Sequence, residues 1–180
     1  GIDIREDAIK VGRQRYAAIA DRLSCYEGTT IPFDDGHFDV VTMFDVIEHL
    51  FDPRAVLAAI ARALGPGGTL VISTPNVDSA SRYLLGADWA VLSPLEHLYY
   101  FNEDSLRRLL EATGFSDVRF VREHVMWGPQ ETINFRYTHA PGGLRARVTR
   151  WIVEQGDARL ARRLQRSGRQ DALLCFARRR

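Results

Sequence analysis

Short apolar segments of strand length alternate along this chain with segments that have the periodicity of amphipathic helices. The pattern predicts strands over residues 1–4, 23–26, 38–44, 69–73, 118–125 and 172–177. It predicts helices over residues 6–21, 53–64, 103–113 and 144–164. Strands and helices that alternate at this spacing are typical of an α/β domain with a largely parallel sheet that helices cover on both sides.

Capping residues predict where two of the helices begin. Asp52 precedes Pro53, which suits the first position of a helix because the N–H that proline lacks has no partner there. Asn102 precedes an acidic first turn, and Gly114 follows the last residue of that helix. Between these signals, residues 38–44 form a near-continuous apolar run. Such a run is typical of a strand that is buried on both faces.

Length and composition exclude several classes of protein. The 180 residues suffice for one domain, and 46% hydrophobic with 26% charged residues is usual for a globular chain. No apolar run approaches the ~20 residues that cross a bilayer, and no signal peptide opens the sequence. Cys25 and Cys175 lie too far apart to pair as metal ligands. We expect both to be buried thiols of a cytoplasmic protein.

Charge is distributed unevenly along the chain. The formal net charge is only +1, yet residues 144–180 contain eleven arginines and three acidic residues. Arg162, Arg163, Arg166 and Arg169 could form a basic face, but phosphate contacts are only one use of such charge. Apolar residues on the same segment need burial, so we expect a solvated helix face and no nucleic-acid partner. The oligomeric state stays open.

We expect one domain in three parts. Residues 1–125 form the core, residues 126–170 an irregular and arginine-rich helical segment, and residues 171–180 the last strand. Ligands of open parallel sheets bind beyond the carboxyl ends of the strands. Asp3, Asp45 and the segment 73–76 stand at three such ends. A carboxylate in the position of Asp3 can accept hydrogen bonds from both hydroxyls of a ribose, and it can also cap a helix.

Several stretches together resemble the class I S-adenosylmethionine-dependent methyltransferases, and among them the small-molecule group that includes the ubiquinone-biosynthesis O-methyltransferases. The matching stretches are Gly1-Ile2-Asp3-Ile4, the run from Ile31 to Val41, Asp45-Val46-Ile47-Glu48-His49-Leu50 with Asp52-Pro53, Leu64-Gly65-Pro66-Gly67-Gly68-Thr69-Leu70, Trp89, Pro94 to Phe101, and Leu106 to Phe115. The resemblance covers roughly residues 1–125 and depends on the order and spacing of these stretches. It implies a Rossmann-like, doubly wound sheet whose last strand, residues 172–177, is antiparallel.

The resemblance also implies a cofactor, S-adenosylmethionine, and residues that bind it. Asp3 is similar to the family's ribose-binding acid, and Ile4 follows it. Glu27 and Gly28 occupy the positions at which members of this family usually contact the adenine ring of the cofactor. Phe44 and Asp45 occupy the strand end that lines the methionine part of the cofactor. The activity implied is methyl transfer to a small molecule, at oxygen.

One part of the family pattern has no counterpart. The glycine-rich loop that follows the family's first strand is absent, because the sequence begins at Gly1 inside an expected strand. We therefore expect a truncated domain that lacks the first strand and first helix of the family. Two alternatives stay open: a truncated or degenerate domain without activity, and a nicotinamide-dependent oxidoreductase. The latter also places an acid at the end of its second strand, but Lys10 is the only lysine available for its usual Tyr-Lys pair.

Two histidines are candidates for the acid–base chemistry of methyl transfer. His97 lies in an aromatic stretch and His49 follows Glu48, and neutral imidazole is well matched to accept a proton near pH 7. Trp89 and Tyr99 offer rings on which a flat substrate could stack, although core packing would explain aromatic residues here equally well.

We expect no metal. The alternative is a site made by Asp45, Glu48 and His49, which converge on one face if this segment is helical, since positions i, i+3 and i+4 are neighbours on a helix.

Overall fold

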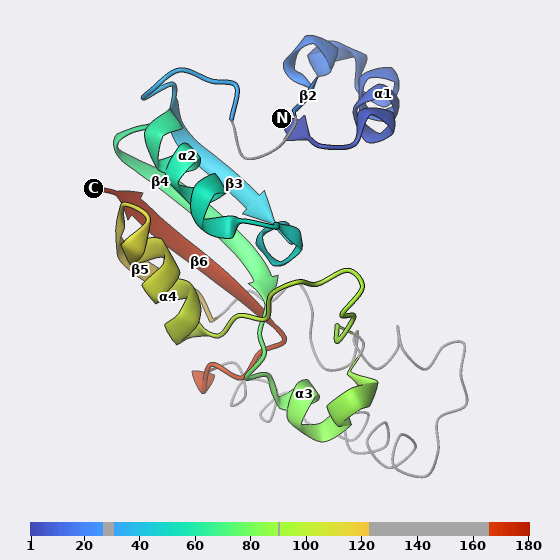
Figure 1. Ribbon diagram of the computed structural model, residues 1–180, viewed down its shortest axis with the longest axis vertical. Coiled ribbons are helices and arrows are strands. Elements are labelled where there is room, and N and C mark those ends of the chain that lie inside the picture. The colour runs from blue at the N-terminus through green and yellow to red at the C-terminus, as the bar shows by residue number, and fades with distance from the viewer. Residues whose placement is uncertain (27–30, 90, 123–165) are drawn as a thin grey trace.

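The computed structural model describes residues 1–26, 31–89, 91–122 and 166–180 (Figure 1). Its strands are β1 (Ile2–Asp3), β2 (Ser24–Cys25), β3 (Phe38–Phe44), β4 (Leu64–Pro75), β5 (Phe115–Phe120) and β6 (Ala172–Arg179). Its α-helices are α1 (Glu6–Arg15), α2 (Pro53–Ala63), α3 (Ala80–Leu85) and α4 (Glu103–Ala112). Three 3₁₀ turns, η1 (Ala17–Arg22), η2 (Ile47–His49) and η3 (Gly86–Asp88), complete the set. The helix expected over residues 144–164 lies outside the described residues.

The strands form a mixed α/β arrangement in two sheets. β1 and β2 make a parallel pair, and the larger sheet has the order β3-β4-β6-β5. β3 and β4 are parallel, whereas β6 runs antiparallel to both β4 and β5, which confirms the expected orientation of the last strand. One continuous sheet was expected. The described strands differ because β3 pairs only with β4, which leaves its other edge without a strand partner among them.

A cleft of about 390 Å³ borders that edge of β3. Gly1, Ile2 and Tyr26 line it from the side of the small sheet, and residues 38 and 40–43 line it from β3. Residues of the small sheet and residues of β3 therefore border the same cleft.

Local capping signals placed the helices correctly. The Asp52 side chain accepts a hydrogen bond from the N–H of Ala55 at 2.9 Å, and Pro53 is the first helical residue of α2. Asn102 and Ser105 form a reciprocal capping box at the start of α4. Both helices lie on the same face of the large sheet (Figure 1).

The core lies between these helices and the large sheet. Met43, Ile72 and Cys175 are opposite one another on β3, β4 and β6, and all three are buried in the same cluster as Leu57 and Ile60 of α2. Removing such side chains from water is the main stabilising contribution to a fold of this kind.

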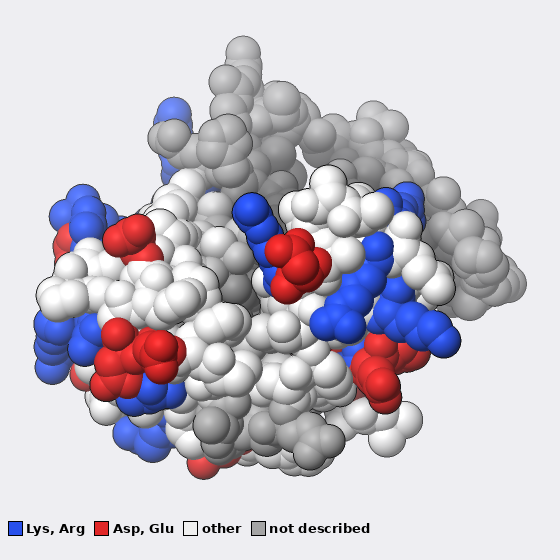
Figure 2. Space-filling model, turned by 90° about the horizontal axis from the view of Figure 1, so that it is seen from above, with Lys and Arg blue, Asp and Glu red and all other residues white. Residues whose placement is uncertain are grey.

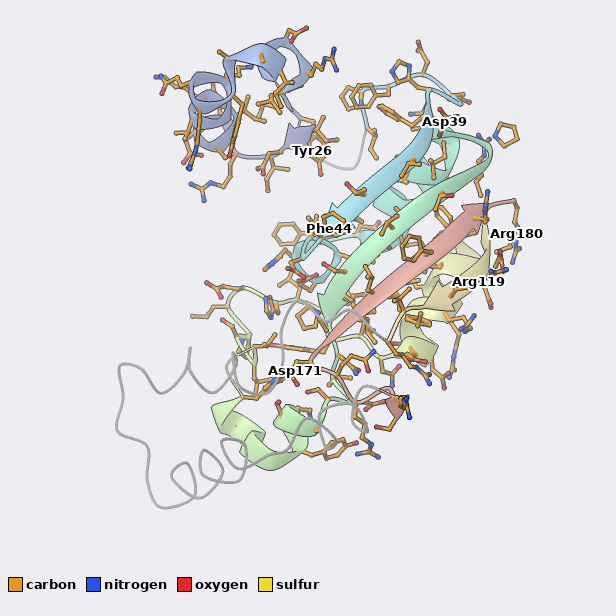
Figure 3. The ribbon with its side chains drawn as sticks, turned by 180° about the vertical axis from the view of Figure 1, so that it is seen from behind. Tyr26, Asp39, Phe44, Arg119, Asp171 and Arg180 are labelled. Atoms are coloured by element: carbon orange, nitrogen blue, oxygen red, sulfur yellow. The ribbon has the colours of Figure 1, made fainter. Side chains whose placement is uncertain are left out.

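The other face of β3 is not buried, which corrects the expectation for residues 38–44. Val40 is 54% exposed and Phe44 is 49% exposed. Seen from behind, this face of the sheet has no described helix in front of it (Figure 3). An apolar run indicates that a strand can be buried on both faces, but burial itself depends on which elements cover it.

The first helix is shorter than the expected 6–21. α1 ends at Arg15, and Tyr16 leaves the helical conformation with φ −124° and ψ 61°. Ile9 is buried, but Tyr16 and Ile19 are exposed. A helix with so little buried surface gains little packing energy from further turns, because most helical stability in proteins comes from packing.

The two cysteines differ in environment. Cys175 is buried in the core, where burial raises the pKa of its thiol to about 12. Cys25 is exposed, so the expectation of a buried thiol was wrong for this residue. It lies on the short edge strand β2, where few neighbours are available to cover it.

We expect Cys25 to react with a soluble maleimide at pH 8 and Cys175 to react at least ~100-fold more slowly, because only the thiolate is nucleophilic and burial also blocks access. Mass spectrometry of digested protein at timed intervals measures both rates. The variant Cys25→Ser should lose the fast phase, and unfolding in denaturant should make Cys175 reactive. Equal rates in the folded protein would contradict the burial of Cys175.

Candidate functional site

The carboxyl ends of β3 and β4 lie side by side. Phe44 of β3 is opposite Ser73 of β4, and Asp45 follows directly. The Ser73 hydroxyl donates to Asp45 Oδ1 at 3.0 Å, and the Asp45 N–H donates to the Ser73 carbonyl at 3.1 Å. Asp45 has φ 52°, in the left-handed region that few non-glycine residues adopt. Backbone strain of this kind collects at functional sites, so this strand end is a candidate site.

Glu48 is a buried acid beside that strand end. It lies in η2 and is 1% exposed, and its Oε2 accepts a hydrogen bond from the Thr74 hydroxyl at 2.9 Å. Its Oε1 has no hydrogen-bond partner within the described ranges. Burial raises the pKa of Glu48 above its ordinary value and the charge of Asp45 raises it further, while the bond from Thr74 opposes them. The site therefore holds a carboxyl group with unused binding capacity.

The Glu48 backbone also anchors a distant loop. Its carbonyl accepts hydrogen bonds from the N–H groups of Leu98 and Tyr99, at 2.8 and 3.2 Å. These two bonds bring His97 next to His49, although the two are far apart in sequence. Their ring centroids are 4.8 Å apart.

Backbone carbonyls determine which nitrogen of each imidazole carries the proton. His49 Nδ1 lies 2.7 Å from the carbonyl of Glu96, and His97 Nδ1 lies 2.8 Å from the carbonyl of Val91. A carbonyl only accepts, so each neutral ring has its proton on Nδ1 and a lone pair on Nε2. His49 Nε2 is 4.0 Å from Glu48 Oε1. The arrangement can take up a proton or bind a cation.

Comparison with known proteins identifies the chain. A family model described as "Methyltransferase domain" matches residues 1–119, about two thirds of the sequence. The chain belongs to the methyltransferase family. Its Rossmann-like sheet with one antiparallel strand is the fold expected from the sequence.

Individual relatives of this methyltransferase-family chain differ in the atom they methylate. A ubiquinone biosynthesis O-methyltransferase from Idiomarina loihiensis is 32% identical over 130 residues, which are 66% of this chain and 52% of that protein. A ubiquinone/menaquinone biosynthesis C-methyltransferase from Psychromonas ingrahamii is 31% identical over 117 residues, or 61% of this chain and 47% of that protein. The chain thus spans about half the length of the curated relatives it matches.

Comparison with solved structures agrees with the fold described above. The structure of a geranyl diphosphate methyltransferase in complex with SAM aligns with a TM-score of 0.60 at 16% identity, covering 100% of this chain and 68% of that one. A likeness at this identity concerns the fold alone.

The residues expected to bind the cofactor are divided between two sheets. Asp3 ends β1, and its Oδ1 accepts a hydrogen bond from the N–H of Arg5 at 2.8 Å; Ile4 beside it is 65% exposed. Phe44 and Asp45 lie at the end of β3 in the larger sheet. Glu27 and Gly28 lie outside the described residues.

Trp89 was expected to offer its ring to a substrate, but the structure buries its side chain. It is 1% exposed, so in this arrangement its ring presents no surface on which a substrate could stack. Core packing explains the residue instead. Tyr99 is 39% exposed, and its hydroxyl donates to the Phe51 carbonyl at 3.2 Å. His97 lies at the candidate site, as described above.

The alternative metal set is not brought together as proposed. Residues 47–49 form a 3₁₀ turn, not an α-helix that includes Asp45, and the Asp45 carboxylate accepts from Ser73. His97 instead joins Glu48 and His49. Sequence reasoning did not connect His97 or Thr74 with Glu48, because neither residue is close to Glu48 in the sequence. A polar residue at the end of a buried strand was the available signal for Thr74.

Charges on the described surface are mixed. Figure 2 shows basic and acidic side chains interspersed on the face it presents, without a continuous basic area. Arg169 stacks on the Tyr83 ring, with its guanidinium carbon 5.2 Å from the ring centroid. Arg162 and Arg163 lie outside the described residues. Within the described part of the chain, no helix is both long enough and apolar enough to cross a membrane.

Proposed function

We propose that this chain contains the catalytic domain of an S-adenosylmethionine-dependent methyltransferase that acts on a small molecule, at an oxygen atom. The observation that carries the proposal is the group of Asp45, Glu48, His49 and His97 at the carboxyl ends of β3 and β4, in a chain whose first 119 residues match the methyltransferase domain. The names of the curated relatives support the small-molecule class.

The residues present suit the cofactor. S-adenosylmethionine, when bound, supplies a methyl group already activated by its sulfonium. Asp3 has an exposed carboxylate at a strand end, and Tyr26, which follows the neighbouring strand β2, donates its N–H to the Asp3 carbonyl at 3.1 Å. We infer that this carboxylate accepts the ribose hydroxyls, because charge-assisted hydrogen bonds to both are geometrically possible. The half-exposed Phe44 ring offers an apolar contact at the other strand end.

The two histidines suit an acceptor hydroxyl. When bound, S-adenosylmethionine would supply the methyl group, and these histidines would act on the hydroxyl of the acceptor that receives it. The acceptor loses one proton, and the Nε2 lone pair of His97 or His49 takes it up. Positioning supplies most of the remaining catalysis, because the methyl group needs only an in-line approach.

The two histidines, His49 and His97, favour an oxygen acceptor over a carbon acceptor. A hydroxyl carries the proton to be removed on the reacting atom itself, within hydrogen-bond reach of an imidazole. Tyr99 lies on the same loop as His97, and part of its ring is exposed and available to contact a flat acceptor.

Isothermal titration of the purified chain with S-adenosylmethionine and with NADH tests the cofactor class. We expect S-adenosylmethionine to bind with a dissociation constant between ~1 μM and ~1 mM, the range common for enzyme substrates, and NADH not to bind. Binding of NADH alone would replace the proposal by the oxidoreductase. Binding of neither would favour a domain without activity.

A further inference from the structure

Ser73 fixes Asp45 in place at the carboxyl ends of β3 and β4. The Ser73 hydroxyl donates to Asp45 Oδ1 at 3.0 Å, and the Asp45 N–H donates to the Ser73 carbonyl at 3.1 Å. The same neighbour therefore holds both the backbone and the carboxylate of Asp45. Ser73 is 2% exposed, so water competes little for its hydroxyl, and a hydrogen bond shielded from water is the stronger for it.

The second carboxylate oxygen of Asp45 is free. Among the residues that the structure describes, the Asp45 side chain accepts a hydrogen bond only at Oδ1. Asp45 is an exposed residue, so a ligand at the strand end can reach Oδ2 directly. Because Ser73 holds the other oxygen, the carboxylate presents its charge in one fixed direction.

The acids at this strand end lack a basic partner, although the chain is rich in arginine. Neither Asp45 nor Glu48 forms an ion pair with an arginine or lysine of the described ranges. Other acids do pair with arginine: Asp7, Asp35, Glu103, Asp104 and Asp117. Burial raises the pKa of Glu48, which favours its neutral form. The exposed Asp45 therefore supplies the negative charge that a ligand meets.

The methyl donor and its demethylated product differ in charge at one atom. S-adenosylmethionine has a positive charge on its sulfonium, whereas S-adenosylhomocysteine, the same molecule without the methyl group, has a neutral sulfur. A fixed carboxylate with no neighbouring cation attracts the first more strongly than the second.

We propose that Asp45, held in place by Ser73, makes this site discriminate by charge between the methyl donor and its demethylated product. Ser73 is a positioning residue, because it acts through the Asp45 carboxylate. The inference deepens the proposed function and rests on it for the cofactor. Its consequence is a site in which a fresh donor readily replaces the product, because the product lacks the charge that Asp45 attracts.

Calorimetric titration with S-adenosylmethionine, S-adenosylhomocysteine and sinefungin tests the proposal without any measurement of activity. Sinefungin has an ammonium group where the donor has its sulfonium methyl, so it keeps the positive charge. At low salt we expect both cationic ligands to bind at least ~10-fold more tightly than S-adenosylhomocysteine. Raising the salt to about 0.5 M should lower this affinity ratio by roughly threefold, because salt screens exposed charges.

Substitutions at the two residues assign the effect. Asp45→Asn keeps an oxygen for the Ser73 hydroxyl but removes the charge, and it should reduce the affinity ratio to below ~2. Ser73→Ala should reduce the ratio to below ~3 and leave the affinity for S-adenosylhomocysteine within about twofold of the parent. Ser73→Thr restores the hydroxyl and should recover the ratio. Damage to the fold would weaken all three ligands alike, so a changed ratio identifies the positioning role.

Asp39→Asn is the matched control. Asp39 is an exposed acid near the opposite end of β3 from Phe44 (Figure 3), and its replacement changes the net charge of the chain as Asp45→Asn does. This variant should keep the affinity ratio of the parent. Circular dichroism of each variant verifies that it is folded.

Two results would overturn charge discrimination at this site. One is an affinity of the parent for S-adenosylhomocysteine that equals or exceeds its affinity for S-adenosylmethionine. The other is a ratio that survives Asp45→Asn or Ser73→Ala. Both leave the proposed function standing, because S-adenosylmethionine still binds. A folded parent that binds none of the three ligands would overturn the proposed function, and this inference with it.

Discussion

Replacing His97 with alanine is expected to lower kcat for methyl transfer by about 10²–10⁴-fold, the usual contribution of a positioned acid–base group. The KM for S-adenosylmethionine should change little, because His97 is placed on the acceptor side and the proposed ribose contact is at Asp3 in the other sheet. Steady-state kinetics with a radiolabelled methyl group measure both constants.

His37→Ala is the matched control for this substitution. His37 is exposed in the turn before β3, where its ring stacks on Phe33 with centroids 5.5 Å apart. The His37→Ala substitution should leave kcat within about twofold of the parent, since an exposed side chain away from the site contributes little to catalysis or stability. A parent-like kcat for His97→Ala would remove His97 from the chemistry.

Replacing Asp3 with alanine is expected to weaken S-adenosylmethionine binding by about 10–100-fold, or ~1–3 kcal/mol, the value of hydrogen bonds to a charged group. The Asp3 side chain also accepts from the N–H of Arg5, so Asp3→Asn, which keeps an acceptor oxygen, separates loss of charge from loss of the local turn. Calorimetric titration of each variant measures the affinity.

The matched control for this substitution is Asp104→Ala, which removes another exposed acid far from Asp3 in the sequence. Asp104 lies in the first turn of α4 and forms only a surface ion pair with Arg108 at 3.6 Å. Surface ion pairs contribute little to stability, so the Asp104→Ala variant should bind the cofactor with the affinity of the parent. If Asp3→Ala also binds like the parent, the ribose lies elsewhere.

Helices and strands that are marked by a capping residue or an apolar run were predicted well from the sequence. The bounds of β3 were those expected from residues 38–44, and both capping residues, Asp52 and Asn102, begin the helices they were expected to begin. These signals work because a cap or an apolar run acts over a few residues. The strand expected over residues 69–73 is longer in the structure, since β4 begins at Leu64 directly after α2.

Features that depend on distant contacts were not predictable in the same way. The pairing of His49 with His97 arises from hydrogen bonds between the Glu48 carbonyl and a loop about fifty residues away, and spacing in a sequence carries no information about such a bond. The burial of Trp89 and the exposure of Val40 likewise depend on which elements pack nearby. Propensity and pattern describe what a segment can do, and tertiary contacts decide what it does.

The order of strands in the large sheet has a consequence for synthesis. β6 is inserted between β4 and β5, although it follows both in the chain. While the ribosome is still making residues 121–171, the edges of β4 and β5 that β6 later joins therefore lack this strand partner. The sheet can close only after residue 179 has emerged, so β4 and β5 become joined through β6 only once all three strands have been synthesised.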